Sequence, residues 1–227
     1  MNRTFDYSRD LLKVIAIVTM TFDHIGLIYY PTELAFRIVG RLAFPIFAYL
    51  LVLGVENTRN VKAHLLRLFL FGLISQIPYF LAFGIAPLER LNIFFSLLLG
   101  ALTIYLLNKK SPLVFLPFLF GFFLNSEGSI YAIAIMIGMK ILHENVKLGT
   151  VTIFMLNAFF LYSPDIIQNI QIASLAALPL IILHTSSRLK METKISANSA
   201  IYSIRRYAFY IYYPLHLTLL HLIDLSL

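Results

Sequence analysis

Residues Tyr7–Tyr30, YSRDLLKVIAIVTMTFDHIGLIYY, decide how the rest of the chain is interpreted. The central run is apolar enough to enter a membrane, yet Asp23 and His24 stand side by side near its far end. Ionisable groups inside an apolar span are costly and usually mark a functional site. Histidine is also the side chain best suited to proton transfer near neutral pH. The alternative is that both residues only hold helices together.

The composition indicates a polytopic membrane protein. The 227 residues are 59% hydrophobic and 13% charged, whereas about a quarter of the residues of a soluble domain are charged. The mean hydropathy is +0.83. Cysteine is absent, which excludes disulfides, a thiolate nucleophile and a thiolate metal site. The first apolar segment lacks a small-residue cleavage site and is read as a retained span.

Segments of sufficient length and apolarity predict an all-α bundle of about nine transmembrane spans, since a helix crosses a bilayer with roughly 20 apolar residues. The fifth and sixth segments are short and could instead form a re-entrant pair. No internal repeat or long linker divides the chain, so we expect one domain over residues 1–227. The expected spans are Leu11–Tyr30, Leu34–Val55, one ending near Gly84, Leu91–Leu107, Pro112–Leu124, Ser129–Leu142, Leu148–Tyr162, Ile166–Leu183 and Tyr207–Ile223. A turn at Ser163–Asp165 and a polar loop at Thr185–Ser199 separate the last three.

The basic residues predict the orientation of these spans. Lys and Arg gather in short cytoplasmic loops. With the N-terminus in the cytoplasm, every Lys and Arg except Arg37, Arg41 and Arg90 falls on the inner side, which leaves the C-terminus outside the cytoplasm. The formal charge of +7 therefore reflects topology and is not a nucleic-acid-binding surface.

Polar residues of several spans fall at a similar depth in the outer half of the bilayer. At 1.5 Å per residue, His24 lies roughly 9 Å below the outer end of the first span, and Arg37 and Arg41 lie about 5 and 10 Å down the second. Gln76 and Asn92 occupy the same layer, as does Ser96. One interpretation is a structural salt bridge between Asp23 and an arginine, with Arg41 also held by carbonyls near Pro45. The other is a site in which His24 accepts a proton and the arginines stabilise an oxyanion.

The last span carries two further candidates, Tyr213 and His216, which could line the same site or serve only for packing. The surrounding tyrosines are also compatible with an interfacial aromatic belt. No set of His or carboxylate residues shows metal-ligand spacing, so no metal is expected.

At the inner surface, basic residues follow the second span and precede the last. They could bind the phosphates of a nucleotide-like cofactor, or they could set the membrane orientation and contact anionic lipid. They are Arg59, Lys62, Arg67, Arg205 and Arg206.

Five long stretches of the chain form a recognisable pattern: LLKVIAIVTMTFDHIGL, FRIVGRLAFPIFAYLLVLGVENTRN, LLRLFLFGLISQIPY, LNIFFSLLLGALTIYLL and FYIYYPLHL. In these stretches the chain resembles the TraX family of membrane proteins, and the resemblance covers Asp10 to Leu220. TraX proteins are similar to the integral-membrane acyltransferases of acyltransferase family 3, whose first span carries a basic residue, ten intervening residues and a histidine. Lys13 and His24 have that spacing, with Lys in place of the more usual Arg.

The resemblance implies a bacterial acetyltransferase of the cytoplasmic (inner) membrane that uses acetyl-CoA and acts on the N-terminal amine of a pilin. The implied acceptor extends to a secreted peptide or a lipoprotein. His24 would be the catalytic base or an acetyl carrier, Asp23 would orient it, and Arg37 and Arg41 would line the site. Lys13 would join the inner basic residues that hold acetyl-CoA.

The sequence departs from the family pattern at two places. Gln76 stands where the family commonly has an acid before Ile-Pro, and Ser126-Glu127-Gly128 stands where it has Asp-aromatic-Gly. Both departures bear on the acceptor more than on the reaction. O-acetylation of a cell-surface glycan is therefore an alternative, and a proton-coupled transporter or a non-catalytic scaffold for secretion machinery are alternatives of other classes.

Overall fold

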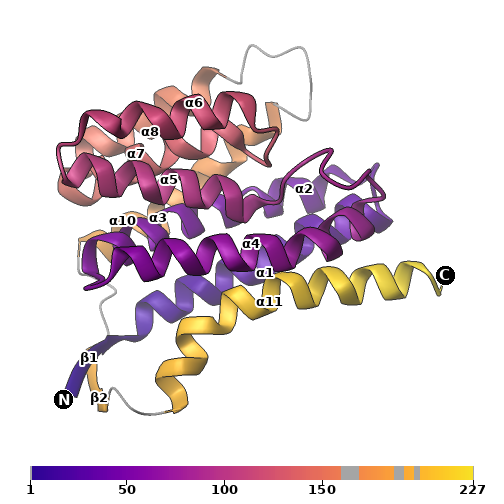
Figure 1. Cartoon of the computed structure of the whole chain (residues 1–227), viewed down its shortest axis with the longest axis horizontal. Coiled ribbons are helices and arrows are strands. Elements are labelled where there is room, and N and C mark those ends of the chain that lie inside the picture. Colours follow the sequence, from indigo (N-terminus) through magenta and orange to yellow (C-terminus); the bar gives the residue numbers. More distant parts are fainter. Residues whose placement is uncertain (1, 160–168, 187–191, 197–199, 227) are drawn as a thin grey trace.

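The computed structural model describes residues 2–159, 169–186, 192–196 and 200–226. Its helices lie side by side along the long axis of the molecule, and the N- and C-termini lie at opposite ends of that axis (Figure 1). The expected turn at Ser163–Asp165 and the end of the expected span Leu148–Tyr162 fall outside the described residues.

The helices follow the segments that the sequence predicts, and a helical bundle is confirmed. They are α1 (Tyr7–Tyr29), α2 (Leu34–Gly40), α3 (Ala43–Asn57), α4 (Val61–Phe83), α5 (Ile93–Asn108), the 3₁₀ turn η1 (Pro112–Val114), α6 (Phe115–Phe123), α7 (Ser129–Glu144), α8 (Val146–Ala158), the 3₁₀ helix η3 (Ile170–Ala177), α10 (Leu178–Thr185) and α11 (Ala200–Asp224).

Among the described residues, three helical segments are long and apolar enough to cross a membrane, and they are Tyr7–Tyr29, Leu34–Asn57 and Val61–Phe83. Their outer faces are apolar; for example, Val14 of α1 and Ile77 of α4 are 56% and 60% exposed. Such surfaces are stable against lipid rather than water. These features indicate a membrane protein, while the count of nine spans and their orientation stay predictions.

The second expected span is not one continuous helix. The helix α2 ends at Gly40 and α3 begins at Ala43, with Arg41 and Leu42 in a turn between them. Pro45 supplies the physical reason, because it has no N–H to bond the carbonyl of the residue four positions earlier, which is Arg41. The break therefore places Arg41 where helical hydrogen bonding is interrupted inside the bundle.

The all-α expectation needs one correction. Strands β1 (Asn2–Asp6) and β2 (Glu192–Ser196) form a two-stranded antiparallel sheet, in which Asn2 pairs with Ser196 and Asp6 with Glu192. The strand β2 lies within the segment expected to be a polar loop, Thr185–Ser199. Its partner β1 lies at the other end of the chain, so no local sequence pattern predicts the pairing.

Candidate functional site

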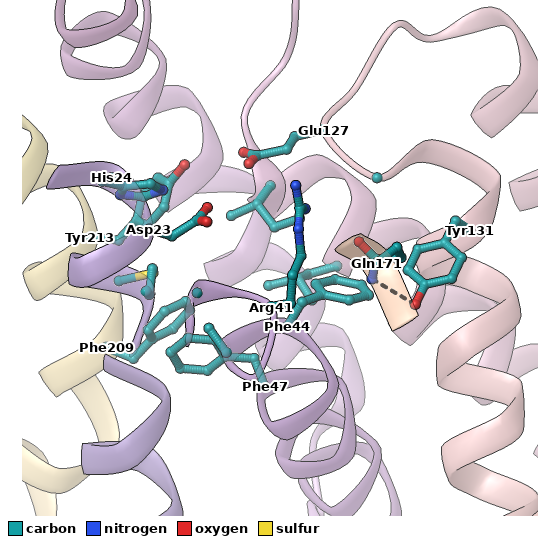
Figure 2. Close-up of a pocket in the computed structure, with 16 residues that line it drawn as sticks. Asp23, His24, Arg41, Phe44, Phe47, Glu127, Tyr131, Gln171, Phe209 and Tyr213 are labelled. Atoms are coloured by element: carbon teal, nitrogen blue, oxygen red, sulfur yellow. Dashed lines mark hydrogen bonds between the residues drawn. The ribbon is translucent and has the colours of Figure 1, made fainter. Parts of the chain in front are cut away.

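A pocket of about 130 Å³ lies between α1, the α2–α3 break, α5, the turn before α7, η3 and α11 (Figure 2). The polar side chains on its wall converge from different elements. The lining residues are Met20, Asp23, His24, Gly40, Arg41, Ala43, Phe44, Phe47, Ile93, Leu97, Glu127, Gly128, Tyr131, Gln171, Phe209 and Tyr213.

The imidazole of His24 is held by a second histidine, His216 of α11. His24 Nδ1 lies 2.7 Å from His216 Nε2, and His216 Nδ1 lies 2.9 Å from the carbonyl oxygen of Tyr212. A carbonyl only accepts, so His216 Nδ1 carries a proton and, in the neutral ring, Nε2 accepts from His24 Nδ1–H. His24 Nε2 then carries the lone pair and receives no hydrogen bond from the described residues. This tautomer makes His24 a proton acceptor on the pocket wall.

Asp23 forms an ion pair with Arg37 across the α1–α2 hairpin, with Oδ2 2.8 Å from Nη1. The two helices approach closely here, because a Cβ on Gly40 would lie 2.2 Å from Asp23 Oδ1. Only glycine leaves room for the carboxylate at this crossing. Asp23 does not hydrogen-bond His24 in the structure; the imidazole is oriented by His216 instead.

Two more charged side chains, Arg41 and Glu127, face the same space (Figure 2). Arg41 Nε and Glu127 Oε2 are buried and lack a hydrogen-bond partner in the described part of the chain. The Glu127 backbone is fixed, since its N–H donates to Leu91 O (2.9 Å) and its carbonyl accepts from Ser96 Oγ (2.6 Å). Burial, helped by the Asp23 carboxylate, raises the pKa of Glu127 to about 7, although Arg90, Arg37 and Arg41 act in the opposite direction.

The remaining wall is largely aromatic, and Tyr131 and Gln171 close one side of it. The amide of Gln171 donates to the Tyr131 hydroxyl (2.8 Å), which in turn donates to Asn157 Oδ1 (3.0 Å). Chemically, the pocket combines a base, a cation suited to an oxyanion and two acids inside apolar walls.

Gln76 and Asn92 do not line this pocket. Gln76 Nε2 donates to Arg90 O (2.8 Å) and its Oε1 accepts from Asn92 N (3.1 Å) and Nδ2 (2.9 Å). Asn92 also caps α5 by accepting from Phe94 N (3.1 Å). The two amides therefore hold the α4–α5 connection, which positions Leu91 and, through it, Glu127.

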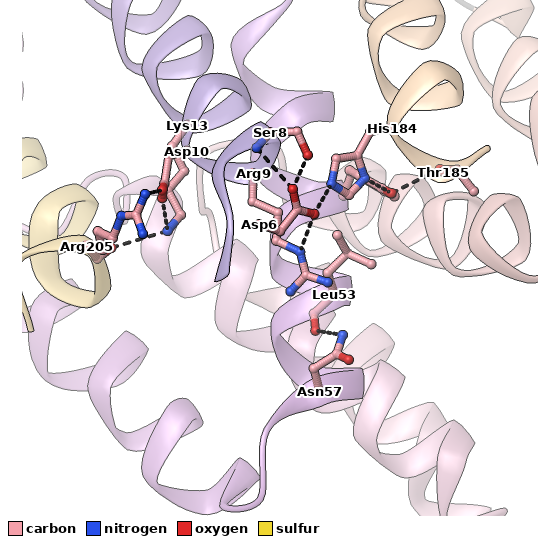
Figure 3. A network of polar contacts seen from close by, with 11 residues as sticks. Asp6, Ser8, Arg9, Asp10, Lys13, Leu53, Asn57, His184, Thr185 and Arg205 are labelled. Carbon is pink, nitrogen blue, oxygen red and sulfur yellow. Dashed lines mark hydrogen bonds and ion pairs between the residues drawn. The ribbon is translucent and has the colours of Figure 1, made fainter. Parts of the chain in front are cut away.

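The predicted cofactor-binding residues lie toward one end of the bundle but in two separate groups. Lys13 and Arg205 meet at Asp10, which pairs with both, and Lys13 Nζ also donates to Arg205 O at 3.2 Å (Figure 3). Arg67 instead contacts His64, with 3.3 Å between Nη2 and Nδ1.

The other members of this set are more exposed. The guanidinium of Arg206 lies over the Tyr207 ring at 5.7 Å, and Arg59 and Lys62 are exposed at the α3–α4 connection. Lys13 and His24 share α1 but are eleven residues apart, so roughly 16 Å of helix separates them. Lys13 is therefore not part of the pocket.

Beside the first group, a buried network ties the start of α1 to α3 and α10 (Figure 3). The Asp6 carboxylate accepts from His184 Nε2 (3.0 Å), and Tyr49 OH lies 2.7 Å from His184 Nδ1. Burial acts to raise the pKa of Asp6, but the hydrogen bonds from Ser8 and His184 outweigh it and leave the pKa below its ordinary value. This network anchors the end of the bundle opposite the C-terminus.

Several pocket residues were not predicted from the sequence. Glu127 was noted only as a departure from a family pattern. The others are Phe44, Phe47, Phe209, Tyr131 and Gln171. Aromatic side chains in apolar spans give no signal that separates a pocket wall from lipid-facing or core positions. No group of three or more His, Asp or Glu residues in the described ranges is arranged to hold a metal ion.

Comparison with known proteins gives a consistent result. The model of the TraX protein family matches residues 8–224. A probable fimbrial assembly protein FimC (serogroup H1) of Dichelobacter nodosus is 30% identical, with 97% of each chain covered. Protein TraX of Escherichia coli is 36% identical over 75 residues, which cover 33% of this chain and 30% of that protein. No solved structure matches. The chain belongs to the TraX family.

Proposed function

We propose that this protein is a membrane-embedded acetyltransferase that moves an acetyl group from cytoplasmic acetyl-CoA to an acceptor outside the cytoplasm. The observation that carries the proposal is the His24–His216 hydrogen bond, whose polarity leaves His24 Nε2 as a base on the wall of a pocket that also contains Arg41. A base and a cation beside one cavity are what acyl transfer to a protonated or hydroxylic nucleophile requires.

In the proposed reaction, His24 removes a proton from the acceptor, whose nucleophilic atom attacks the carbonyl carbon of the thioester. The new bond to carbon forms, the C–S bond breaks, and the thiolate leaves and is protonated. Arg41 donates to the carbonyl oxygen as it becomes an oxyanion. Arg37 acts indirectly, because it holds Asp23 in place at 2.8 Å. Direct transfer and a transient acetyl on His24 both fit this arrangement.

The acyl donor enters from the inner end in this proposal. There, Lys13 and Arg205 form one basic group, Arg67 and Arg206 lie near His64, and Arg59 and Lys62 are exposed nearby. Such groups suit the phosphates of CoA, with its long arm directed along the bundle to the pocket. This proposal has the chain cross the bacterial cytoplasmic membrane nine times, with the N-terminus inside. The placement of the two termini at opposite ends of the bundle supports an odd number of spans (Figure 1).

The proposed acceptor is the N-terminal amine of a pilin or fimbrial subunit, or of another secreted peptide or lipoprotein. Support comes from the D. nodosus relative, which is named a probable fimbrial assembly protein and matches over 97% of both chains. An α-amine with a pKa near 8 is mostly protonated at neutral pH, so its acetylation needs a base such as His24.

The test is mass spectrometry of membrane and surface polypeptides from cells with and without the protein. We expect one polypeptide to gain a single acetyl group, to lose it in His24→Ala, and to keep it in the matched variant His143→Ala, whose imidazole is exposed at the end of α7. Acetyl groups found only on glycans would replace the amine by a hydroxyl as acceptor. Identical polypeptides and glycans in all strains would refute the proposal.

A further inference from the structure

The pocket contains two carboxylates, those of Asp23 and Glu127, that the proposed base and oxyanion chemistry does not use. Asp23 Oδ1 and Glu127 Oε2 are both buried and both lack a hydrogen-bond partner among the residues that the structure describes. They come from α1 and from the turn before α7, and Figure 2 shows both side chains beside the same cavity. Buried carboxylate oxygens without partners are costly, so they point to a ligand that supplies donors.

The aromatic part of the cavity wall favours a positively charged ligand, and the two acids offset the charge of Arg41, which lines the same cavity. Phe44, Phe47 and Phe209 line the cavity together with Tyr131 and Tyr213. Aromatic faces attract cations, most strongly where water is excluded. An aromatic wall with two unpaired carboxylate oxygens is suited to an ammonium group more than to an anion or a neutral alcohol.

The number of hydrogen-bond donors distinguishes an amine substrate from a hydroxyl substrate. A primary ammonium has three N–H donors, and the pocket offers three acceptors that carry no proton of their own: Asp23 Oδ1, Glu127 Oε2 and His24 Nε2. A hydroxyl has one O–H donor, so it would leave two of the three unsatisfied. Unpaired buried polar groups are what allows a site to reject a close analogue strongly.

We propose that Glu127 is a specificity-determining residue, which with Asp23 and His24 binds the acceptor as a primary ammonium and excludes hydroxyl acceptors. This inference rests on the proposed function. The ammonium gives one proton to His24 Nε2, and the neutral nitrogen attacks the thioester carbonyl carbon. The C–N bond forms and the C–S bond breaks, Glu127 takes the second nitrogen proton, and the thiolate leaves as a thiol with one of the two protons. One proton is released overall.

The experiment measures acceptor binding alone, on the full chain in lipid nanodiscs without acetyl-CoA. The probes are glycinamide and glycolamide, which differ in carrying an ammonium or a hydroxyl, and binding is followed by saturation-transfer NMR. We expect glycinamide to bind at least about 10-fold more tightly, since a charge-assisted hydrogen bond is lost with glycolamide. Glu127→Gln should remove this preference, Glu127→Asp should keep it, and Glu33→Gln, an exposed glutamate, should change nothing.

Equal binding of the two probes to the unmodified protein would overturn the inference even if every Glu127 variant failed to fold. Equal weakening of both probes in a folded Glu127→Gln variant would also overturn it, as would an Asp variant that behaves like Gln. Failure of the proposed function looks different: selective, Glu127-dependent amine binding with no acetylated product from any amine would refute acetyl transfer and leave the recognition site standing.

Discussion

Gly40→Ala tests the α1–α2 crossing that positions Asp23. An added Cβ would lie 2.2 Å from Asp23 Oδ1, 2.3 Å from its Cβ and 2.5 Å from its Cγ, whereas ordinary contact begins at 3.4 Å. The helices must therefore separate by about 1 Å at this point. Over-packing of this kind costs about 1–3 kcal/mol. At about 2–4 °C per kcal/mol for a chain of this size, the melting temperature should fall by roughly 2–12 °C.

The rate of acetyl transfer should fall by more than the loss of folded protein explains. A misplacement of about 1 Å near reacting atoms can lower a rate by about 10²-fold. The assays are thermal unfolding in detergent and acetyl transfer measured by mass spectrometry. Gly54→Ala is the matched control, since its Cβ would meet only the tip of the His64 side chain at 3.3 Å.

A double-mutant cycle isolates the contact itself. Asp23→Gly removes the Cβ as well as the carboxylate, so Gly40→Ala should cost little stability in that background. Additive losses in the double variant, or a Gly40→Ala protein with unchanged melting temperature and activity, would show that the close approach of α1 and α2 is not what holds Asp23.

Three further predictions concern His216, Glu127 and topology. His216→Ala should lower kcat by about 10²-fold with little change in KM. His216→Gln keeps an acceptor for His24 Nδ1–H and should recover part of the lost kcat. Equal losses of kcat in both variants would contradict a positioning role. Because the pKa of Glu127 is raised to about 7, glycinamide binding should increase from pH 6 to 7.5 as the carboxyl ionises beside Asp23, Arg37, Arg41 and Arg90, and should decline above about pH 8 as amines lose their proton. Glu127→Gln should lack the rising limb, measured by NMR titration, and an unchanged profile would count against the assignment. Since the chain has no cysteine, Lys110→Cys should react with an impermeant maleimide only from the cytoplasmic side and Glu33→Cys only from outside; labelling of both from one side would refute the orientation.

The helices, and the grouping of Asp23 with Arg37, followed from the sequence because apolar length and charge are local signals. The sequence also grouped His24 with Arg41, since both stand at a similar depth, and named Tyr213 of the last span as a candidate for the same site. It could not distinguish Gln76 and Asn92 from site residues, because depth says nothing about which way an amide points. The partnership of His24 with His216 depends on packing between α1 and α11, and the role of Gly40 depends on a crossing that spacing alone does not reveal.

The order of synthesis acts on the two halves of this site differently. Asp23 meets Arg37 within one hairpin, so the charge on the first helix can be neutralised as soon as the second emerges. His24 must wait for His216, which is 192 residues further along the chain. At about 5–20 residues per second, translation takes on the order of 10–40 s to deliver that partner. A nascent or truncated polypeptide thus carries a neutralised Asp23 but an unoriented His24 imidazole, so the proposed acyl transfer should begin only after the last helix is in place.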